Sequence, residues 1–564
     1  LDYIAFIELG EKKDDNPYET FKDWYTKDYQ SFIDYNIQDV EIVDKLEDKM
    51  GLITLLLTLA YEAKVNFEDV FGQVKYWDIL IYNFLRKRKI AIPQKTSHSK
   101  DEKYEGAYVK VPQTGLHKWV VSFDLNSLYP HLIMQYNISP ETLLRSRSQD
   151  INVDDMLKET KLNLIEKTTM TPNGAVFKTD KQGFLPAIMQ ELYDDRVVYK
   201  KKMLQAQQAY EDTKDEKYLK LISRYNNIQM ARKISLNSAY GAIGNQWFRY
   251  YDIAIAEGIT TSGQLSIRWV ENKVNNYLNK ILDTNDKDYV IASDTDSIYI
   301  TLDELVSKVK PKNTVQFLNK VATEKLEPFI DKSYEELKDY TQAFENKMMM
   351  KREVIADKGI WVAKKRYILN VHDSEGVLYK EPKLKMMGIE AVKSSTPLIC
   401  REKIKEALKI IMSGDEKTLN DFIQDFHKKF TSVNPKEIAF PRSVNGLKKY
   451  SDSSTTFKKG TPMHIKGCLI YNHKIKQNKL IHKYPLIQEG DKIKFLYMKQ
   501  PNPYSANVIS FMSVLPEEFK VNSYIDYDIQ FEKVFVDPLI LIVNSINWKI
   551  DTTYGTQGTL EDFF

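Results

Sequence analysis

Two apolar runs with the character of β-strands end in aspartate. The first, in residues 119–123, contains two valines, a tryptophan and a phenylalanine, and Asp124 follows it directly. The second, in residues 289–291, leads to Asp294 and Asp296, after which a third apolar run begins. Short runs of β-branched and aromatic residues bounded by polar residues are typical of strands. The pattern predicts a strand with Asp124 at its tip and a hairpin with Asp294 and Asp296 at its turn.

The segment between these aspartates has the pattern of helices. Residues 187–240 contain neither glycine nor proline over 54 positions, and glycine returns at Gly241. An unbroken stretch of this length predicts long helices. The polar sequence EDTKDEK at residues 211–217 interrupts it. We therefore expect two helices that pack antiparallel as a hairpin.

Each predicted helix carries a polar or basic stripe. Arg196 and Lys200 lie four positions apart in the first helix, and Gln229, Lys233 and Asn237 repeat that interval in the second. Residues four positions apart share one face of a helix. Such a face could bind a triphosphate. It could equally be a solvated surface, which is the usual role of a run of charges.

The aspartates suggest a metal site. Mg²⁺ prefers oxygen ligands and leaves coordination positions open for substrate phosphates. Two carboxylates from neighbouring strands are therefore suited to phosphoryl or nucleotidyl transfer. The Asp-x-Asp sequence alone does not decide this, because it is more often a solvated loop or a Ca²⁺ site.

Three short sequences, taken together, resemble the signatures of family B DNA polymerases. They are DxxSLYP in SFDLNSLYP at 122–130, KxxxNSxYG in RKISLNSAYG at 232–241, and DTDS in SDTDSIYI at 293–300. All three stand in the order of the family. KKRY at 364–367 is similar to its primer-side motif, and YEGA at 104–107 is similar to its YxG(G/A) element. The likeness covers nearly the whole chain, and segments such as ISPETL, GNQWFRYYD, EPKLKMMGIE and KSSTP narrow it to the T-even-type bacteriophage replicative polymerases.

Charge is distributed unevenly along the chain. The net charge of +3 over 564 residues does not by itself predict nucleic-acid binding. Residues 427–483, however, contain 13 Lys or Arg against two acids, whereas residues 1–48 contain 14 acids against five Lys. The basic segment predicts a field that faces DNA, although a solubilising surface would have the same composition.

Composition also bears on size and compartment. A chain of this length is expected to hold several domains, each with its own core. The two cysteines, Cys400 and Cys468, do not indicate a disulfide framework and fit a reducing compartment. The longest apolar run, in residues 51–60, is too short to span a bilayer, so no membrane association is expected. Together with the resemblance, this predicts the cytoplasm of an infected bacterial host.

The resemblance implies an α+β multidomain chain with the right-hand polymerase fold. We expect an antiparallel-sheet palm, two-helix fingers, a mainly helical thumb and a remnant of an RNase H-like exonuclease domain. The implied boundaries are 1–51 for the exonuclease remnant, 52–95 for a returning segment of the N-terminal domain, 96–183 and 245–395 for the palm, 184–244 for the fingers, 396–556 for the thumb and 557–564 for a tail.

The N-terminal remnant is expected to lack proofreading activity on its own. Tyr35 and Asp39 match the family's YxxxD motif, which supplies one carboxylate to the nuclease metals. The other two exonuclease motifs are expected before Leu1, and metal-dependent hydrolysis draws carboxylates from more than one motif. The chain thus resembles a truncated or split polymerase. A separate N-terminal exonuclease polypeptide is a potential partner.

The resemblance also implies the reaction, in which a primer 3′-hydroxyl attacks the α-phosphate of a deoxynucleoside triphosphate on a DNA template. Two Mg²⁺ ions are expected, with Mn²⁺ as a substitute. The implied ligands are Asp124, Asp296, the Leu125 carbonyl and Glu353, which could instead be a surface glutamate. Asp294 is expected to tune the site, and Lys233 is counted with the catalytic residues.

Further roles carried over from the family concern the substrates. The triphosphate is expected to contact Ser127, Leu128, Tyr129, Arg196, Lys200, Lys233 and Asn237. Tyr129 would lie under the sugar and exclude a 2′-hydroxyl; its alternative is a core tyrosine at a strand end. The nascent pair and primer are expected to contact Tyr240, Gly241, Lys364, Lys365, Arg366 and Tyr367.

The last eight residues, QGTLEDFF, have the pattern of a sliding-clamp-binding peptide. One helical turn would present Gln557, Leu560, Phe563 and Phe564 to an apolar pocket. Alternatively, the two rings fold back on the thumb.

Two rival functions remain open from the sequence. One is a noncatalytic primer-template or clamp-binding subunit descended from a polymerase, which the loss of a metal carboxylate would favour. The other is a nuclease, because the same metals hydrolyse phosphodiesters. The finger helix and the SLYP motif have no role in hydrolysis, and Asp124 and Asp296 are both present. The sequence therefore favours the polymerase.

Overall fold

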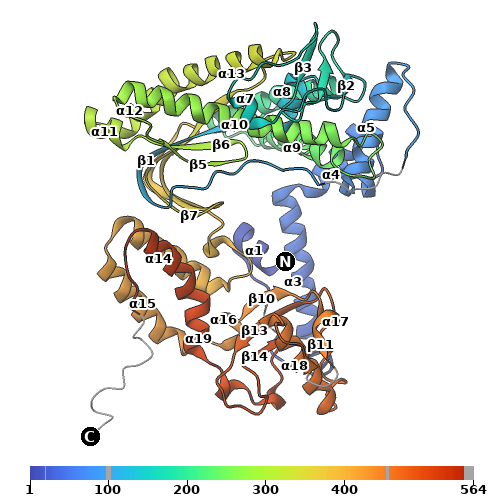
Figure 1. Cartoon of the computed structure of the whole chain (residues 1–564). Helices are drawn as coiled ribbons and strands as arrows, with labels where there is room; N and C mark the ends of the chain where they lie inside the picture. The colour runs from blue at the N-terminus through green and yellow to red at the C-terminus, as the bar shows by residue number, and fades with distance from the viewer. Residues whose placement is uncertain (15, 19–20, 97–102, 453–455, 552–564) are drawn as a thin grey trace.

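A six-stranded antiparallel sheet lies at the centre of the computed structural model, which describes residues 1–14, 16–18, 21–96, 103–452 and 456–551 (Figure 1). The strand order is β5-β6-β1-β7-β8-β9. The strands are β1 (Gly115–Leu125), β5 (Val290–Asp294), β6 (Ser297–Thr301), β7 (Met350–Ala363), β8 (Arg366–Ser374) and β9 (Val377–Met387). Alternation along β1 sends Val121 and Phe123 into the main hydrophobic core and Val120 into a smaller core on the other face.

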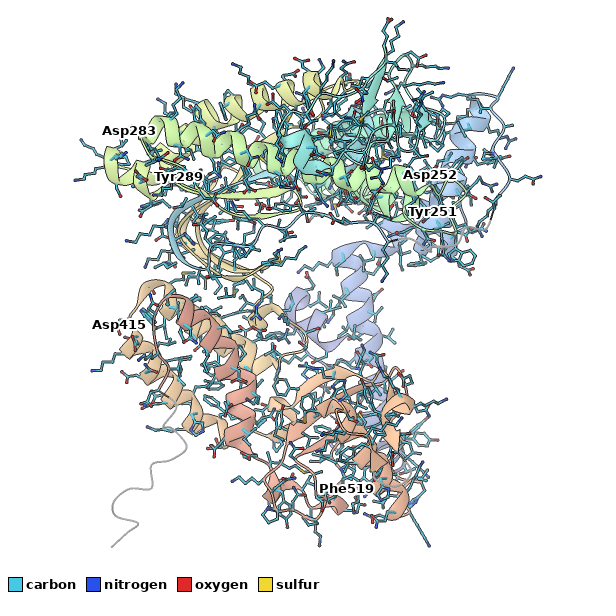
Figure 2. All side chains as sticks on the ribbon, in the orientation of Figure 1. Tyr251, Asp252, Asp283, Tyr289, Asp415 and Phe519 are labelled. Carbon is cyan, nitrogen blue, oxygen red and sulfur yellow. The ribbon has the colours of Figure 1, made fainter. Side chains whose placement is uncertain are left out.

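Helices cover one face of this sheet (Figure 1). They are α6 (Leu128–Gln135), α10 (Ile253–Leu282), α11 (Asp303–Val309), α12 (Thr314–Val321) and α13 (Glu327–Thr341). The longest, α10, begins at Asp252, whose carboxylate accepts hydrogen bonds from the amides of Ala254 (2.8 Å) and Ile255 (3.3 Å). It ends at Asp283 in the left-handed conformation, so Asp252 and Asp283, both labelled in Figure 2, mark its ends.

The two helices predicted in residues 187–240 are confirmed. They are α8 (Phe184–Thr213) and α9 (Lys217–Ile243), which pack against each other. The break falls at Lys214, whose φ of 54° ends α8 inside the predicted polar interruption. On its other side α9 packs against α4 (Leu52–Ala63) and α5 (Gln73–Lys87).

The N-terminal segment consists of α1 (Asp2–Leu9), α2 (Phe21–Lys27) and α3 (Tyr29–Met50). Helix α3 runs from the lower part of the molecule to the upper part, where α4 begins (Figure 1). Gly51, with φ 60°, lies between the two helices and turns the chain in a conformation that favours glycine. The segment thus joins the two halves of the structure.

The C-terminal part, from residue 396 onward, packs around a second hydrophobic core, which also includes Ile360 and Ile368 of the central sheet. Its helices are α14 (Leu398–Ser413), α15 (Glu416–Phe430), α16 (Pro435–Ile438), α17 (Leu447–Tyr450), α18 (Met463–Gln477), α19 (Tyr527–Phe531) and α20 (Asp537–Ser545). Asp415, labelled in Figure 2, caps α15 by accepting from the Thr418 amide at 2.9 Å. A three-stranded sheet also occurs here, formed by β10 (Phe440–Ser443), β13 (Lys492–Tyr497) and β14 (Val508–Phe511).

The remaining elements are short. A second three-stranded sheet is formed by β2 (Leu143–Arg145), β3 (Thr168–Met170) and β4 (Val176–Lys178), and β11 (Ser451–Asp452) pairs with β12 (Thr456–Phe457). The short helix α7 (Val153–Leu157) packs against α10. Short 3₁₀ and π segments are η1 (Phe67–Phe71), η2 (Ala322–Leu326), η3 (Glu390–Val392), η4 (Glu517–Phe519), η5 (Asn522–Tyr524) and η6 (Glu532–Val536). Within the described ranges, no helix combines the length and apolarity needed to cross a membrane.

Candidate active site

The predicted aspartates converge where three neighbouring strands of the central sheet, β1, β5 and β6, begin or end. Asp124 on β1 and Asp294 on β5 both lie opposite Ser297 on β6. Asp296 stands in the turn between β5 and β6, and its carbonyl accepts a hydrogen bond from the Leu125 amide at 2.8 Å. The backbone of the residue after Asp124 is therefore bonded directly to Asp296. The strand and the hairpin turn meet as the sequence predicted.

The electrostatic environment of this cluster disfavours the ionisation of both Asp124 and Asp296. Burial, followed by repulsion from Asp296 and Glu353, raises the pKa of Asp124 to about 7. Burial also raises the pKa of Asp296 to about 6, with repulsion from Asp294 and Glu353 adding to it. A group of acids that resist ionisation needs either protons or a cation. Hard carboxylate oxygens that repel each other form a donor set that suits a divalent cation.

These pKa values predict that Asp124→Asn stabilises the folded chain in the absence of divalent cations. A carboxyl with a raised folded-state pKa favours folding while protonated, and this contribution is lost as pH rises from about 4 through about 7. The asparagine does not ionise. Because Asp124 is only partly buried, solvent screening reduces the effect, and at pH 8 in EDTA the variant should be more stable by on the order of 2 kcal/mol. Thermal denaturation at pH 4 and pH 8 measures the difference, which should be small at pH 4.

The control for this measurement is Asp425→Asn, which changes an exposed carboxyl on α15. It should leave the melting temperature unchanged at both pH values. Equal stability of wild type and Asp124→Asn at pH 8 would contradict the electrostatic reading of the cluster.

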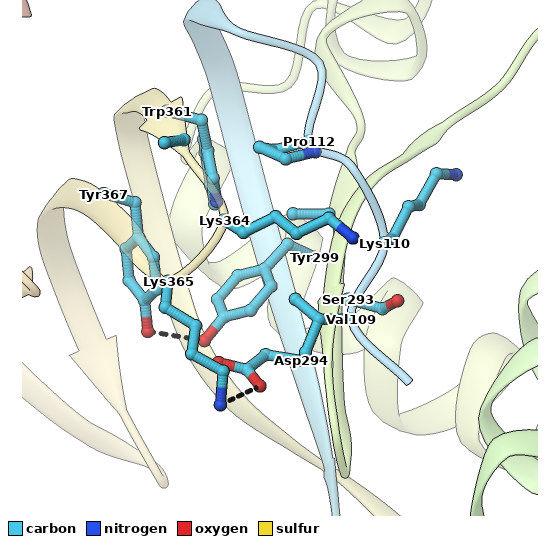
Figure 3. Close-up of a pocket in the computed structure, with 12 residues that line it drawn as sticks. Val109, Lys110, Pro112, Ser293, Asp294, Tyr299, Trp361, Lys364, Lys365 and Tyr367 are labelled. Carbon is cyan, nitrogen blue, oxygen red and sulfur yellow. Dashed lines mark hydrogen bonds and ion pairs between the residues drawn. The ribbon is translucent and has the colours of Figure 1, made fainter. Parts of the chain in front are cut away.

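Two other acids near this cluster, Glu353 and Asp294, each form an ion pair with a lysine. Glu353 on β7 accepts from Ser122 Oγ at 3.3 Å and forms an ion pair with Lys385 Nζ at 2.7 Å. Lys365 Nζ lies 3.1 Å from Asp294 Oδ1 (Figure 3). Among the described residues, no group of three or more His, Cys, Asp and Glu is arranged to hold a metal ion. Asp124 and Asp296, in contrast to Asp294 and Glu353, form no ion pair with a lysine among the described residues.

Tyr129 lies within electrostatic reach of Asp296 and packs against a second tyrosine. It follows Ser127, which begins α6 with φ 48°, and the buried Leu128. The Tyr129 ring centre is 4.6 Å from that of Tyr240 on α9. The hydroxyl of Tyr104, in the YEGA segment, is 3.1 Å from the Tyr240 hydroxyl. The structure therefore brings together three tyrosines that the sequence motifs placed far apart.

The predicted cations lie on the two long helices. Arg196 on α8 reaches the loop after β1, where its Nη1 donates to Ser127 Oγ at 3.3 Å. Lys200 on α8 and Lys233 and Asn237 on α9 are exposed. Arg196 thus contacts the segment that carries Asp124, while the other three side chains face solvent.

Gly241 has a neighbour that the sequence did not indicate. A Cβ added at Gly241 would lie 2.4 Å from Gln73 Oε1, at the end of a side chain from α5. Gln73 therefore occupies the approach to the Gly241 α-carbon in this structure. No signal in the sequence pairs these residues, because they come from helices 168 positions apart in the chain.

The segment 364–367 spans the turn between β7 and β8. Lys364 and Lys365 are exposed in the turn, and Arg366 forms an ion pair with Glu390 at 2.7 Å. Tyr367 is only 4% exposed, and its hydroxyl is 2.7 Å from that of Tyr299 (Figure 3). Lys365 thus points to the aspartates, whereas Tyr367 is built into the sheet. Tyr299 was not predicted, although its position in the run after Asp296 could have suggested it.

The predicted exonuclease residues lie apart from this cluster, on α3. Asp39 forms an ion pair with Lys13 at 2.7 Å, and the Tyr35 ring centre lies 4.9 Å from that of Trp24. The predicted clamp-binding residues Gln557, Leu560, Phe563 and Phe564 lie outside the described residues.

The structure thus places paired carboxylates at the end of an antiparallel sheet, next to long helices that carry cations, and this donor set is suited to metal-dependent nucleotidyl transfer. The family model for DNA polymerase family B matches residues 71–554. The chain belongs to DNA polymerase family B.

The relatives lie in phages and cellular organisms. The chain is 36% identical to the DNA-directed DNA polymerase of Escherichia phage RB69, covering 100% of this chain and 68% of that protein. It is 34% identical to that of Enterobacteria phage T4, covering 91% of this chain and 63% of that protein. DNA polymerase 1 of Sulfolobus acidocaldarius is 28% identical over 83% of this chain and 48% of its own length. The chain thus spans about two thirds of the phage proteins that it matches, and the predicted family is confirmed.

Proposed function

We propose that this chain extends a DNA primer on a template strand by nucleotidyl transfer from deoxynucleoside triphosphates. The observation that carries the proposal is the convergence of Asp124 and Asp296, whose backbones are linked through Leu125. Membership of DNA polymerase family B supports it, as do the two phage relatives named DNA-directed DNA polymerase.

The carboxylates would hold two Mg²⁺ ions, which Mn²⁺ could replace. Asp124 and Asp296 would bridge them, with the Leu125 carbonyl as a further ligand. When bound, such ions lower the pKa of the primer hydroxyl and neutralise the triphosphate. Glu353 is the least direct candidate ligand because Lys385 already pairs with it at 2.7 Å. Asp294, held by Lys365, would tune the charge of the site from its edge.

The side chains of α8 and α9 would bind the triphosphate. Arg196, Lys200, Lys233 and Asn237 can place positive charge and an amide where negative charge develops on the departing pyrophosphate. Arg196 is already tied to Ser127, at the start of the Tyr129 segment. Tyr129 and Tyr240 would form the surface under the sugar and the nascent base pair.

The elements would then correspond to palm, fingers and thumb. The central sheet and its helices would be the palm (96–183 and 245–395), α8 and α9 the fingers (184–244), and residues 396–556 the thumb. Lys364 and Lys365 would contact primer phosphates, largely without regard to sequence. Residues 1–51 would be the exonuclease remnant and 52–95 the returning segment.

Two partners follow from the same reading. The tail at residues 557–564 would bind a sliding clamp, and an exonuclease polypeptide would be a second potential partner. Support for both comes from the sequence motifs alone. Neither partner is required for the primer extension proposed above.

Primer extension tests the proposed function. The purified chain is incubated with a labelled primer on a longer template, Mg²⁺ and deoxynucleotides. We expect elongation to the template end, with each added base set by the template. Shortening of the primer would indicate a nuclease instead. Binding of the primer-template without elongation or shortening would indicate a noncatalytic subunit, and either result overturns the proposal.

A further inference from the structure

Three helices meet at Arg232, a residue that no sequence motif singles out. On α9, its Nη1 forms an ion pair with the Glu62 carboxylate of α4. Its Nη2 lies 2.9 Å from Asp195 Oδ2 of α8. The side chains of Arg232 and Glu62 are only 17% and 16% exposed, whereas that of Asp195 is 52% exposed. One guanidinium therefore joins α9 to α4 and to α8.

Burying this ion pair costs desolvation free energy, so the pair is a weak source of stability. Burial raises the pKa of Glu62 to about 7, although the attraction of Arg232 acts in the opposite direction. Buried ion pairs gain little over apolar packing, and their best-attested role is to specify register. A planar guanidinium fixes the directions of two partners at once, which an ammonium group does not do. The geometry is thus suited to setting how the helices align.

The position of Arg232 connects it with the triphosphate-binding side chains. Arg232 directly precedes Lys233 on α9, and its partner Asp195 directly precedes Arg196 on α8. The ion pair therefore fixes the two helices to each other at the turns that carry these cations. A change in register at this point would displace Lys233 and Arg196 relative to one another.

A second row of contacts holds the same face of α9. Tyr76 on α5 lies 2.6 Å, hydroxyl to hydroxyl, from Ser235, and Trp77 Nε1 donates to Ser238 Oγ at 3.0 Å. Positions 232, 235 and 238 share one side of a helix with 3.6 residues per turn, whereas 233 and 237 fall on the opposite side. The rear of α9 is thus fixed by α4 and α5, and its front carries Lys233 and Asn237.

We infer that Arg232 is a positioning residue for the incoming nucleotide: it joins α4, α8 and α9 so that Arg196 and Lys233 meet one triphosphate together. The inference rests on the proposed function, because it concerns the same nucleotide site. Arg232 itself does not touch the substrate. It acts through the relative placement of the two cations beside it.

Steady-state kinetics with Arg232→Gln measure this role. We expect KM for deoxynucleotides to rise on the order of tenfold, with a smaller change in kcat, since misplaced binding groups weaken productive contacts. The affinity for primer-template should stay within about twofold. Arg232→Lys should remain defective, because a lysine keeps the charge but loses the fork. Arg224→Gln, an exposed arginine on the same helix, is the matched control and should retain the wild-type KM.

A double variant separates positioning from general stabilisation. If Arg232 acts by aligning Arg196, then Arg232→Gln should raise KM by less than about threefold when Arg196→Ala is already present. Independent effects would multiply instead, and that result would overturn the inference. A wild-type KM in Arg232→Gln would overturn it as well. Asp195→Asn removes the ion pair between Arg232 and α8. Because Asp195 is half-exposed, this variant should fold normally.

Backbone hydrogen exchange tests whether Arg232 holds the helices together, and it does not depend on catalysis. A negative result in this experiment is therefore distinguishable from a failure of the polymerase proposal. Arg232→Gln should speed exchange in the parts of α8 and α9 around Asp195 and Arg232, relative to Arg224→Gln. Exchange elsewhere, for example in α15, should be unchanged. Equal exchange in both variants around Arg232 would show that it does not hold the helices together.

Discussion

Asp296→Asn is expected to abolish primer extension, lowering kcat/KM on the order of 10³-fold or more. Asp296 stands in the turn that bonds to the strand end carrying Asp124, so its carboxylate is one of the two that would share the cations. An amide carries no negative charge and binds a divalent cation weakly. Loss of one shared ligand removes both the activation of the primer hydroxyl and the neutralisation of the triphosphate.

Single-turnover extension of a labelled primer with Mg²⁺ measures this effect. Primer-template binding is measured in parallel and should be retained, because the change is confined to the carboxylate cluster. Asp294→Asn serves as the neighbouring comparison and should cost about tenfold or less, since Lys365 rather than a shared cation pairs with Asp294. Asp425→Asn, far along the chain on α15, should have no effect. Extension by Asp296→Asn at a rate within tenfold of wild type would contradict the assignment of the site.

The local elements of this site were predictable because short-range patterns specify them. The apolar run before Asp124 became β1, and the runs around Asp294 and Asp296 became the β5–β6 hairpin. The absence of glycine and proline between residues 187 and 240 correctly predicted two long helices. In each case the information lies within one strand or helix.

The partners across elements were not predictable in the same way. Periodicity states which face a residue occupies, but it does not state what lies opposite. The ion pairs of Glu353 with Lys385 and of Asp294 with Lys365, and the position of Gln73 over Gly241, each join separate elements. Tyr367 illustrates the consequence: its motif suggested a primer contact, whereas its hydroxyl is bonded to Tyr299 inside the sheet. Its proposed contact with the primer remains a prediction.

The N-terminal helices show the same limit. Tyr35 and Asp39, which match the family's YxxxD motif, both lie on α3. The sequence did not indicate that Lys13 would pair with Asp39 at 2.7 Å. An aspartate neutralised by lysine is a poorer metal ligand than one that lacks a cation partner. Asp124 and Asp296 differ in having no such partner among the ion pairs of the described residues, which marks the central sheet as the stronger metal-binding candidate in the described structure.

Tyr129→Ala is expected to weaken discrimination against ribonucleotides on the order of 10²-fold while leaving deoxynucleotide use nearly intact. The Tyr129 ring packs against Tyr240, with ring centres 4.6 Å apart, and lies near the backbone of α10 at Gly263, where an added Cβ would lie 3.4 Å from a ring atom. A ring with packed neighbours cannot easily yield to an additional oxygen on the sugar. Overpacking of this kind costs about 1–3 kcal/mol, which corresponds to the expected loss of selectivity.

The ratio of kcat/KM for deoxynucleotides to that for ribonucleotides measures the effect with the same primer-template. Tyr129→Phe is the matched control: it keeps the ring and removes only the hydroxyl, so it should retain the wild-type ratio. Tyr129→Ala should change kcat/KM for deoxynucleotides by less than about fivefold, because Tyr240 and the carboxylates remain in place. If the alanine variant discriminates as well as wild type, Tyr129 is a packing residue at the start of α6 and sugar selection lies elsewhere.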